Sequence, residues 1–552
     1  MWFFRAVAFD LDGTLTSGER IATEVLTAID DTRRDHAVLL VTGRVKADLE
    51  RVFPGLIEHF SAVVTENGAV LTTRTPDGWE TRLLREPVDV AIDKMLADRS
   101  ISTSRGDVLT AVDGRDAGVA ADVISDLGLD SQVIHNRGRA MILPAGVTKG
   151  SGLRAGLQAL GLGEHSAIAV GDAENDLSLL HAAEVGVAVA DAVPSLKDHA
   201  DLVLDLPDGK GVVDLLAGPL LTGRQRLCPS RRWITIGHHE DGSAATVPGS
   251  QASILVTGSS GSGKSYLAGL LCERWIDAGY ALLVIDPEGD HLGLARRPGV
   301  HLVDASAGLP SPHDLMALLR FRQVSVVLDL SGIDLDAQLG YLDRLPAAIA
   351  AERAQYGVPH WVIYDEAHQQ ARLEQSHKVA VGTGSCLVTW RPELLSPELT
   401  DDIDVTISIA EPAGSAPATQ TYATLTLGGA SRSFQVGRRT SEHVRHQRKY
   451  AQSPLPPERR FYFHDQDRAK EAVSAATLEE FRHQVGHVDS STLDFHLSRG
   501  DFSRWVAGIV ADHALAGELA RIEDNWGTRR AAAIERAREQ ICRAVERRYF
   551  QP

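Results

Sequence analysis

The chain has 552 residues, of which 43% are hydrophobic and 24% are charged, and its formal net charge is −18. These fractions are those of ordinary globular proteins and indicate neither disorder nor a membrane span. At about 150 residues per domain the length predicts about three or four domains, and the negative charge disfavours broad, nonspecific binding to nucleic acid. The four cysteines lack C-x-x-C spacing, which argues against a disulfide framework and a zinc site. Because the apolar start is too short for a signal peptide, we expect a cytoplasmic location and no membrane partner.

The first predicted strand, residues 4–9, ends in an acidic turn that contains Asp10 and Asp12. Because these residues are two positions apart in an extended chain, their side chains point to the same face. Crowded carboxylates repel each other unless a cation such as Mg²⁺ lies between them. Two later apolar runs also end in polar residues, at Thr42 and at Asp172. Since ligands bind at the carboxyl edge of a parallel sheet, we expect one metal- and phosphate-binding site there.

These motifs, in this order, resemble the haloacid dehalogenase superfamily, specifically its Cof-like phosphatases, over residues 1–215. The resemblance implies that Asp10 attacks phosphorus, while Asp12 protonates the leaving group and later activates water. It implies that Thr42 and Lys149 hold the phosphoryl oxygens. The residues that would bind or support Mg²⁺ are Asp10, Asp12 through its carbonyl, Asp172, Asn175 and Asp176. The alternative is that these acids are only turn and helix-cap residues.

A long insert between Thr42 and Lys149 breaks the alternation of predicted strands and helices. In the family, an insert at this place is an α+β cap that closes over the site and selects the substrate. The polar candidates for substrate contact are Arg105, His135, Asn136 and Arg137. We expect most of them to be solvated surface residues.

A glycine-rich loop, residues 258–265, lies near the middle of the chain between an apolar run and an apolar helical segment. Its backbone N–H groups, the helix N-terminus and Lys264 would bind nucleotide phosphates, and the Ser265 hydroxyl would bind Mg²⁺. A flexible Gly/Ser linker, the alternative, would not be framed by a strand and a helix. The predicted ATP-binding residues of the loop are Gly258, Ser260, Gly261, Ser262, Gly263, Lys264 and Ser265.

Two later predicted strands end in Asp329 and Asp365, and either acid is a candidate for the second Mg²⁺ partner. We choose Asp365, because the adjacent Glu366 supplies the base that ATP hydrolysis needs. We expect Asp329 to be a helix cap at the end of its strand. The same capping role is the alternative interpretation of Asp286.

The motifs at 286–290 (DPEGD), 328–332 (LDLSG), 364–368 (YDEAH) and 388–392 (VTWRP) resemble the HerA/FtsK-type ATPases, over about residues 230–445. These are typically ring-forming motors that act on DNA or protein. The resemblance therefore implies a homo-oligomer, with a hexamer expected, and nucleic acid as a candidate partner. Trp390 stands where the family usually has a polar sensor. The candidate arginines for a neighbouring active site are Arg296, Arg297 and Arg391.

The sequence thus predicts an α/β enzyme with a Rossmann-like phosphatase core and α+β cap, a P-loop ATPase domain with a parallel sheet, and a small helical C-terminal domain. The predicted boundaries are 1–215 with the cap at about 83–145, a linker at 216–228, the ATPase at 229–445 and a helical interaction module at 446–552. Mg²⁺ and ATP are the expected cofactors. A phosphorylated small molecule or a nucleic-acid end is the expected substrate.

Two alternatives to this bifunctional enzyme remain open. In the first, the chain is a ring-forming nucleic-acid motor whose phosphatase domain processes nucleotides or nucleic-acid ends. In the second, ATP binding without turnover is a switch that gates the phosphatase. Salt-dependent DNA binding would favour the motor, and ATP binding without hydrolysis would favour the switch.

Overall fold

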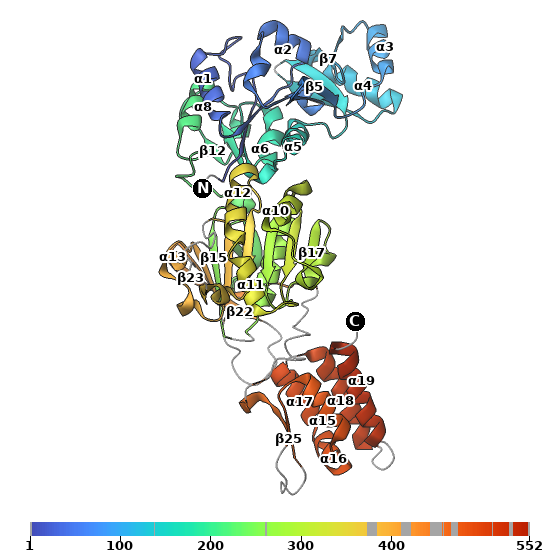
Figure 1. Cartoon of the computed structure of the whole chain (residues 1–552). Coiled ribbons are helices and arrows are strands. Elements are labelled where there is room, and N and C mark those ends of the chain that lie inside the picture. Colours follow the sequence, from blue (N-terminus) through green and yellow to red (C-terminus); the bar gives the residue numbers. More distant parts are fainter. Residues whose placement is uncertain are drawn as a thin grey trace.

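The computed structural model describes residues 3–549, apart from 137, 260–261, 373–382, 410–420, 442–454, 456, 465–472, 511 and 529–533. The described chain forms an eight-stranded sheet with a small four-stranded sheet beside it, an eleven-stranded sheet and a group of C-terminal helices (Figure 1). None of the helices in these ranges is long and apolar enough to span a bilayer.

The central strand of the eight-stranded sheet is β1 (Ala6–Phe9), all of whose residues are buried. It pairs in parallel with β2 (Ala37–Val41) and β10 (Ala167–Gly171). Such continuous apolar runs are typical of parallel strands that are covered on both faces. The sheet has the order β12-β11-β10-β1-β2-β3-β4-β5, in which the β3–β4 and β4–β5 pairs are antiparallel. The remaining strands are β3 (Ala62–Thr65), β4 (Val70–Thr75), β5 (Gly78–Leu83), β11 (Val185–Ala188) and β12 (Leu202–Val203).

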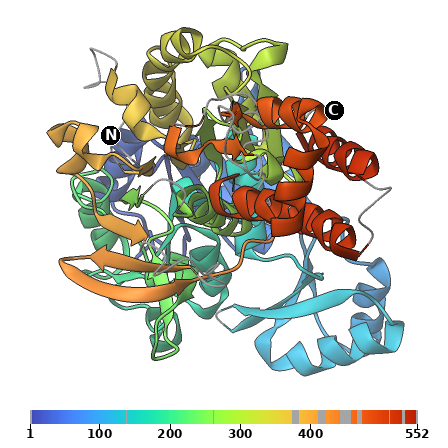
Figure 2. The ribbon, with the colours of Figure 1, turned by 90° about the horizontal axis from the view of Figure 1, so that it is seen from below.

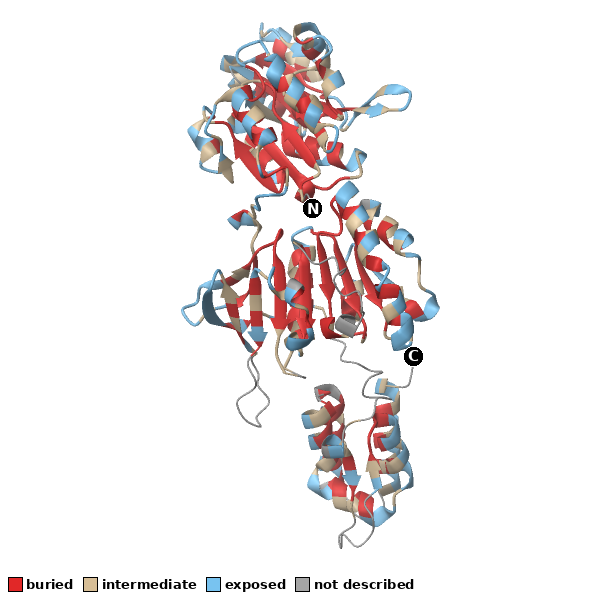
Figure 3. Ribbon diagram, turned by 60° about the vertical axis from the view of Figure 1, so that its left-hand side comes forward, coloured by how far each residue is buried: buried red, intermediate tan, exposed pale blue. Residues whose placement is uncertain are grey.

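Helices cover both faces of this sheet. One face packs against α1 (Thr23–Thr32), α2 (Lys46–Val52) and α8 (Asp208–Ala217). The other face packs against α5 (Lys149–Ala159) and α6 (Leu177–Ala182). Strands β1, β2, β3, β10 and β11 between them are almost wholly buried (Figure 3). The predicted Rossmann-like core is confirmed.

The insert after β5 folds as a small α+β layer of its own. Its antiparallel sheet has the order β6-β7-β9-β8 and packs against two helices, burying Ile92, Val123 and Ile142 among others. This cap stands to the side of the sheets (light blue in Figure 2). Its elements are α3 (Val90–Asp98), β6 (Ser104–Arg105), β7 (Thr110–Asp113), α4 (Ala117–Leu127), β8 (Ser131–Asn136) and β9 (Arg139–Pro144). The insert thus has the α+β fold that was predicted for it.

The eleven-stranded sheet has a parallel half and an antiparallel half. Its order is β14-β13-β23-β22-β21-β15-β20-β19-β16-β18-β17, and the strands from β21 to β17 pair in parallel. The parallel half was predicted, whereas the antiparallel extension was not. The strands are β13 (Ile234–His238), β14 (Ala244–Val247), β15 (Ser253–Thr257), β16 (Leu282–Asp286), β17 (Val300–Asp304), β18 (Ser325–Asp329), β19 (Trp361–Tyr364), β20 (Ser385–Thr389), β21 (Val405–Ile409), β22 (Tyr422–Leu427) and β23 (Ala430–Val436).

Helix α9 (Lys264–Asp277) covers one face of the parallel half, where Trp275 stacks on Trp361 with ring centroids 3.9 Å apart. Helices α10 (Pro312–Arg320), α11 (Leu335–Leu342) and α12 (Leu345–Tyr356) cover the other face. Because α9 begins at Lys264, its packing fixes the last residues of the glycine-rich loop at the edge of the sheet.

The described part of the C-terminal region is mostly helical, as predicted, with a short hairpin of β24 (Phe461–Phe463) and β25 (Val473–Ala475) that was not predicted. Aromatic rings form its core, with Phe461, Phe481 and Trp505 in mutual contact. The helices are α15 (Leu478–His487), α16 (Ser490–Arg499), α17 (Asp501–Trp505), α18 (His513–Thr528) and α19 (Ile534–Tyr549).

A buried polar network joins the first sheet to the second. Its centre is the fully buried carboxylate of Glu184, which accepts hydrogen bonds from His165 Nδ1 at 2.7 Å, Tyr280 OH at 3.1 Å and Ser250 Oγ. The second ring nitrogen of His165 faces the Ala278 carbonyl oxygen at 3.0 Å. Burial alone would raise the pKa of Glu184, but the hydrogen bond and charge of His165 hold it below its ordinary value.

Replacing Glu184 with Ala is expected to lower the free energy of unfolding by about 3 kcal/mol, because the buried His165 and the partly buried Arg232 lose their acid. Urea unfolding followed by tryptophan fluorescence measures this, with the exposed Glu86→Ala as the matched control. A group with a lowered pKa stabilises the fold above its ordinary pKa and ceases to do so below its folded pKa. The deficit should therefore shrink as the pH falls through the pKa of Glu184. Coincident unfolding curves for both variants would contradict this role.

Candidate active sites

The carboxyl ends of β1, β2 and β10 bring the first group of predicted residues to one edge of the sheet. Asp10 follows β1, Thr42 follows β2 and Asp172 follows β10, and the parallel register keeps these three strand ends level. Carboxylate oxygens of Asp10, Asp172 and Asp176 lie within 4.8 Å of one another, and all three residues are buried. This all-oxygen donor set is of the kind that Mg²⁺ prefers.

Lys149 links two of these acids. It is the first residue of α5, a helix start that Thr148 and Ser151 fix by a reciprocal capping box. Its ammonium lies 2.6 Å from Asp10 Oδ1 and 2.5 Å from Asp176 Oδ1, and the side chain is 1% exposed. Burial alone would lower the pKa of Lys149, but the charges of Asp10 and Asp176 raise it. The site thus holds a permanent cation beside the carboxylate predicted to attack phosphorus.

The acidic cluster carries more negative charge than Lys149 neutralises. Burial, and then the neighbouring charge of Asp176, raise the pKa of Asp10 to about 8. The second oxygen of Asp176 accepts hydrogen bonds from the Asp172 and Ala173 backbone N–H groups at 3.0 and 3.1 Å. Asp176 therefore holds Lys149 and the loop that carries Asp172, and a further cation fits between Asp10 and Asp172.

Asp12 lies apart from this acidic cluster because Arg44 holds it. Arg44 Nε donates to Asp12 Oδ2 at 2.8 Å and Arg44 Nη2 donates to Asp12 Oδ1 at 2.7 Å. The buried Thr42 hydroxyl oxygen accepts a hydrogen bond from the Arg44 backbone N–H at 3.2 Å. The sequence analysis assigned no role to Arg44, although it follows Thr42 in the same strand-end motif.

Glu66 ties the cap to the core. Its buried carboxylate accepts hydrogen bonds from the backbone N–H groups of Asp107, Val108 and Leu109 at 2.7 to 2.8 Å. Strand β8 of the cap also lies against the turn Glu174–Asp176 of the core. The cap is thus fixed above the acidic edge, and Glu66 is a residue that the sequence analysis missed.

Four residues of the cap, Arg105, His135, Asn136 and Arg137, were predicted as candidates for substrate contact. Arg105 forms an ion pair with Asp93 and donates to the Val88 carbonyl oxygen, so its guanidinium is engaged within the cap. His135 is exposed. Arg137 lies outside the described residues, and nothing is described of the Asn136 side chain.

The second group of predicted residues surrounds the start of α9. Lys264 is the first residue of this helix, is 7% exposed and donates to the Ser259 carbonyl oxygen at 2.9 Å. Gly263 before it has a φ of 105°, which glycine adopts without strain. Ser265 follows in the first turn, and Gly258 and Ser262 lie in the described part of the loop. Ser260 and Gly261 lie outside the described residues.

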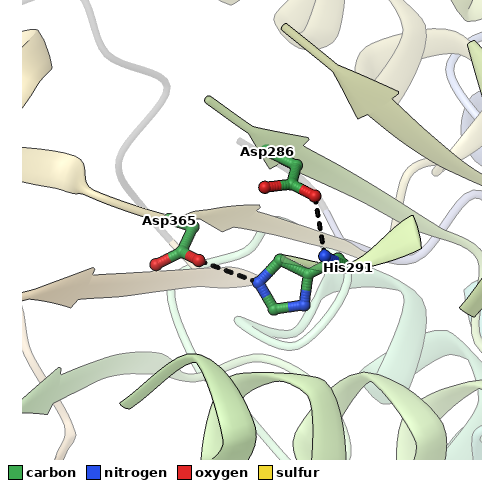
Figure 4. A group of neighbouring side chains, drawn as sticks. All are labelled: Asp286, His291 and Asp365. Atoms are coloured by element: carbon green, nitrogen blue, oxygen red, sulfur yellow. Dashed lines mark hydrogen bonds and ion pairs between the residues drawn. The ribbon is translucent and has the colours of Figure 1, made fainter. Parts of the chain in front are cut away.

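Asp365 follows β19 at the same edge and is held by His291. Its Oδ2 lies 2.9 Å from His291 Nε2, and both side chains are buried (Figure 4). Asp286, at the end of β16, accepts hydrogen bonds from the backbone N–H groups of Gly289, Asp290 and His291 at 2.7 to 3.0 Å. Asp286 therefore caps the turn that positions His291, and His291 is a third residue, after Arg44 and Glu66, to which the sequence analysis gave no role.

Glu366 has a left-handed backbone, with a φ of 50°. Such strain at a charged residue persists only where the surroundings impose it, and it is concentrated at functional positions. The Glu366 carboxylate lies 3.3 Å from His368 Nδ1, and His368 in turn contacts Thr389 and the ring of Trp390. Asp329, in contrast, accepts a capping bond from the Ser331 N–H at 2.9 Å.

The candidate arginines differ in what they contact within the chain. Arg297 forms an ion pair with Asp277 and donates to Thr440 Oγ1 at 2.7 Å, which engages it within its own subunit. Arg391 lies over the Trp390 ring at 3.9 Å.

Comparison with known proteins identifies both regions. Residues 7–93 and 115–216 match the haloacid dehalogenase-like hydrolase family, and residues 249–381 match the central domain of helicase HerA. Phosphoglycolate phosphatase 2 of Saccharolobus solfataricus is 32% identical over 219 residues, which cover 38% of this chain and 90% of that relative. The chain belongs to the haloacid dehalogenase-like hydrolases.

This hydrolase has further relatives of the same kind. A phosphoglycolate phosphatase of Sulfurisphaera tokodaii is 31% identical over 220 residues, covering 38% of this chain and 92% of the relative. A solved haloacid dehalogenase-like hydrolase from Bacteroides thetaiotaomicron covers 39% of this chain and 98% of its own, at 20% identity and a TM-score of 0.33. The prediction of a phosphatase-type hydrolase joined to a HerA-type ATPase domain is confirmed.

Proposed function

We propose that this hydrolase is a bifunctional, Mg²⁺-dependent phosphomonoesterase and ATP-hydrolysing enzyme. The observation that carries the first activity is Lys149, buried between Asp10 and Asp176 with Asp172 beside them. We further propose the division into a phosphatase at 1–215, a linker at 216–228, an ATPase at 229–445 and a helical interaction module at 446–552.

In the proposed phosphatase reaction, an Asp10 oxygen attacks phosphorus while the ester P–O bond breaks, and Asp12 gives a proton to the leaving oxygen. Water then attacks the aspartyl-phosphate, Asp12 takes the proton of that water, and phosphate leaves with Asp10 regenerated. Thr42 and Lys149 hold the phosphoryl oxygens. Asp10, Asp172 and the Asp12 carbonyl would hold Mg²⁺, which would neutralise charge on the phosphoryl group.

The substrate is proposed to be a small phosphate ester. The named relatives are phosphoglycolate phosphatases, which makes 2-phosphoglycolate the first compound to test. A screen of 2-phosphoglycolate, sugar phosphates, nucleotides and phosphorylated DNA ends, read out as released phosphate, tests the proposal. Turnover of DNA ends alone would favour the alternative of a nucleic-acid motor with an end-processing phosphatase.

In the proposed ATPase reaction, the loop and Lys264 bind the nucleotide phosphates, while Ser265 and Asp365 would hold Mg²⁺. Glu366 polarises the attacking water. Two geometric observations support this assignment: the strained backbone of Glu366, and the buried hydrogen bond by which His291 fixes Asp365.

We expect the protein to assemble into a ring, with six subunits, and hydrolysis to depend on assembly. The match to the HerA central domain and the need for a charge such as Arg391 beside the γ-phosphate support this expectation. Light scattering with and without ATP should give a multiple of the 59.5 kDa subunit mass, and ATPase activity per subunit should rise with protein concentration. A strict monomer with full activity at all concentrations would contradict the ring and favour the ATP-sensing switch.

A further inference from the structure

The guanidinium of Arg44 contacts three side chains in the proposed phosphatase site. It binds both oxygens of Asp12, its Nη1 donates to Asp48 Oδ2 at 2.8 Å, and it lies over the Phe53 ring at 5.5 Å. The Arg44 backbone is also fixed, because its carbonyl oxygen accepts from the Glu66 N–H at 2.9 Å. The hydrogen bond to Asp12, above all, raises the pKa of Arg44, so the group stays cationic. The side chain is 21% exposed, so it can meet a ligand.

This arrangement conflicts with the role proposed for Asp12. Each oxygen of the Asp12 carboxylate already accepts one hydrogen bond from the Arg44 guanidinium, and the pair fixes the orientation of Asp12 toward Arg44. Release from Arg44 would therefore free Asp12 to turn toward the leaving oxygen and exchange a proton with it. Because Arg44 would lose two charge-assisted hydrogen bonds, the exchange is favourable when another anion replaces Asp12 at the Nε–Nη2 edge of the guanidinium.

We propose that Arg44 recognises a second anionic group of the substrate, a carboxylate close to the phosphate ester, and that this exchange releases Asp12 for catalysis. The inference rests on the proposed phosphatase function. Asp12 lies two residues after the attacking Asp10, so its partner Arg44 lies within reach of a short substrate bound there. The contacts with Asp48 and Phe53 keep the guanidinium oriented while its partner changes. A substrate without the second anion leaves Arg44 bound to Asp12 and reacts slowly.

The test compares kcat/KM for 2-phosphoglycolate and for 2-hydroxyethyl phosphate, which has the same number of carbons and an uncharged CH2OH group in place of the carboxylate. The full chain is measured as wild type and as Arg44→Gln. We expect the kcat/KM of the wild type to be about 100-fold higher for 2-phosphoglycolate, because a bidentate charged pair typically contributes a difference of that size. We expect Arg44→Gln to reduce this ratio to within about threefold, chiefly through lost turnover of 2-phosphoglycolate.

Arg51→Gln is the matched control, because Arg51 also pairs with Asp48 but is exposed and does not contact Asp12. Arg51→Gln should keep the wild-type ratio. Arg44→Lys keeps the charge without the two-pronged geometry and should give an intermediate ratio, which preserves the test if Arg44→Gln does not fold. An unchanged ratio of kcat/KM in both Arg44 variants, or an equal loss of kcat/KM on both esters, would overturn this inference and leave the proposed phosphatase function intact. No phosphate release from any ester by the wild type would overturn the proposed function itself.

Discussion

Replacing Asp10 with Asn is expected to abolish phosphate release from phosphomonoesters, by about 1000-fold or more, because an amide does not attack phosphorus. The substitution keeps the shape of the side chain and removes one negative charge from the cluster of Asp10, Asp172 and Asp176, in which Asp10 and Asp176 share Lys149. We therefore expect the fold to persist. Initial rates with 2-phosphoglycolate and a thermal unfolding curve measure the two effects.

Asp77→Asn is the matched control for this substitution, since Asp77 is exposed and lies in the turn between β4 and β5. It should keep the wild-type rate. Near wild-type activity in Asp10→Asn would mean that another group attacks phosphorus. Loss of the folded state would instead mean that the ion pair with Lys149 is needed for stability.

Replacing Lys264 with Ala is expected to weaken ATP binding by about 100-fold or more, because the phosphates lose their direct cationic contact. Glu366→Gln is expected to keep ATP binding within a few-fold and to lower hydrolysis by about 100-fold or more, because water activation is a separate task. Equilibrium binding of a fluorescent ATP analogue and steady-state phosphate release distinguish these outcomes.

The neighbouring His368→Gln is a useful comparison for Glu366→Gln, because His368 contacts the Glu366 carboxylate without carrying the proposed base. We expect it to reduce hydrolysis less than Glu366→Gln does. Equal loss of ATP binding in Lys264→Ala and Glu366→Gln would show that Glu366 supports the structure of the site and does not activate water.

The sequence was most informative where an acidic residue directly follows a buried strand. Asp10 and Asp172 each follow a run of apolar residues, and parallel pairing of those strands necessarily brings both acids to one edge. Lys149 was predicted only through the family resemblance, because nothing local to a helix start indicates which distant acids it will meet. Its partners Asp10 and Asp176 lie 139 and 27 residues away in the sequence.

Contacts across loops were not predictable from the sequence. The pairs Arg44–Asp12 and His291–Asp365 join residues 32 and 74 positions apart, and no periodic pattern relates them. The network of Glu184 joins two separate sheets, so the sequence showed only an acid beside an apolar run. The antiparallel strands β22 and β23 contain Ser or Thr and are partly exposed, and the paired strands β24 and β25 have three residues each, so the sequence did not distinguish any of them from loops.

The most direct test of two independent active sites on one chain is a crossed assay of the full-length protein with Mg²⁺. Phosphate release from 2-phosphoglycolate and from ATP is measured for the wild type, Asp10→Asn and Glu366→Gln. We expect Asp10→Asn to lose only the first activity and Glu366→Gln to lose only the second. Loss of both activities in either variant, or ATP hydrolysis that disappears with Asp10, would contradict two separate sites.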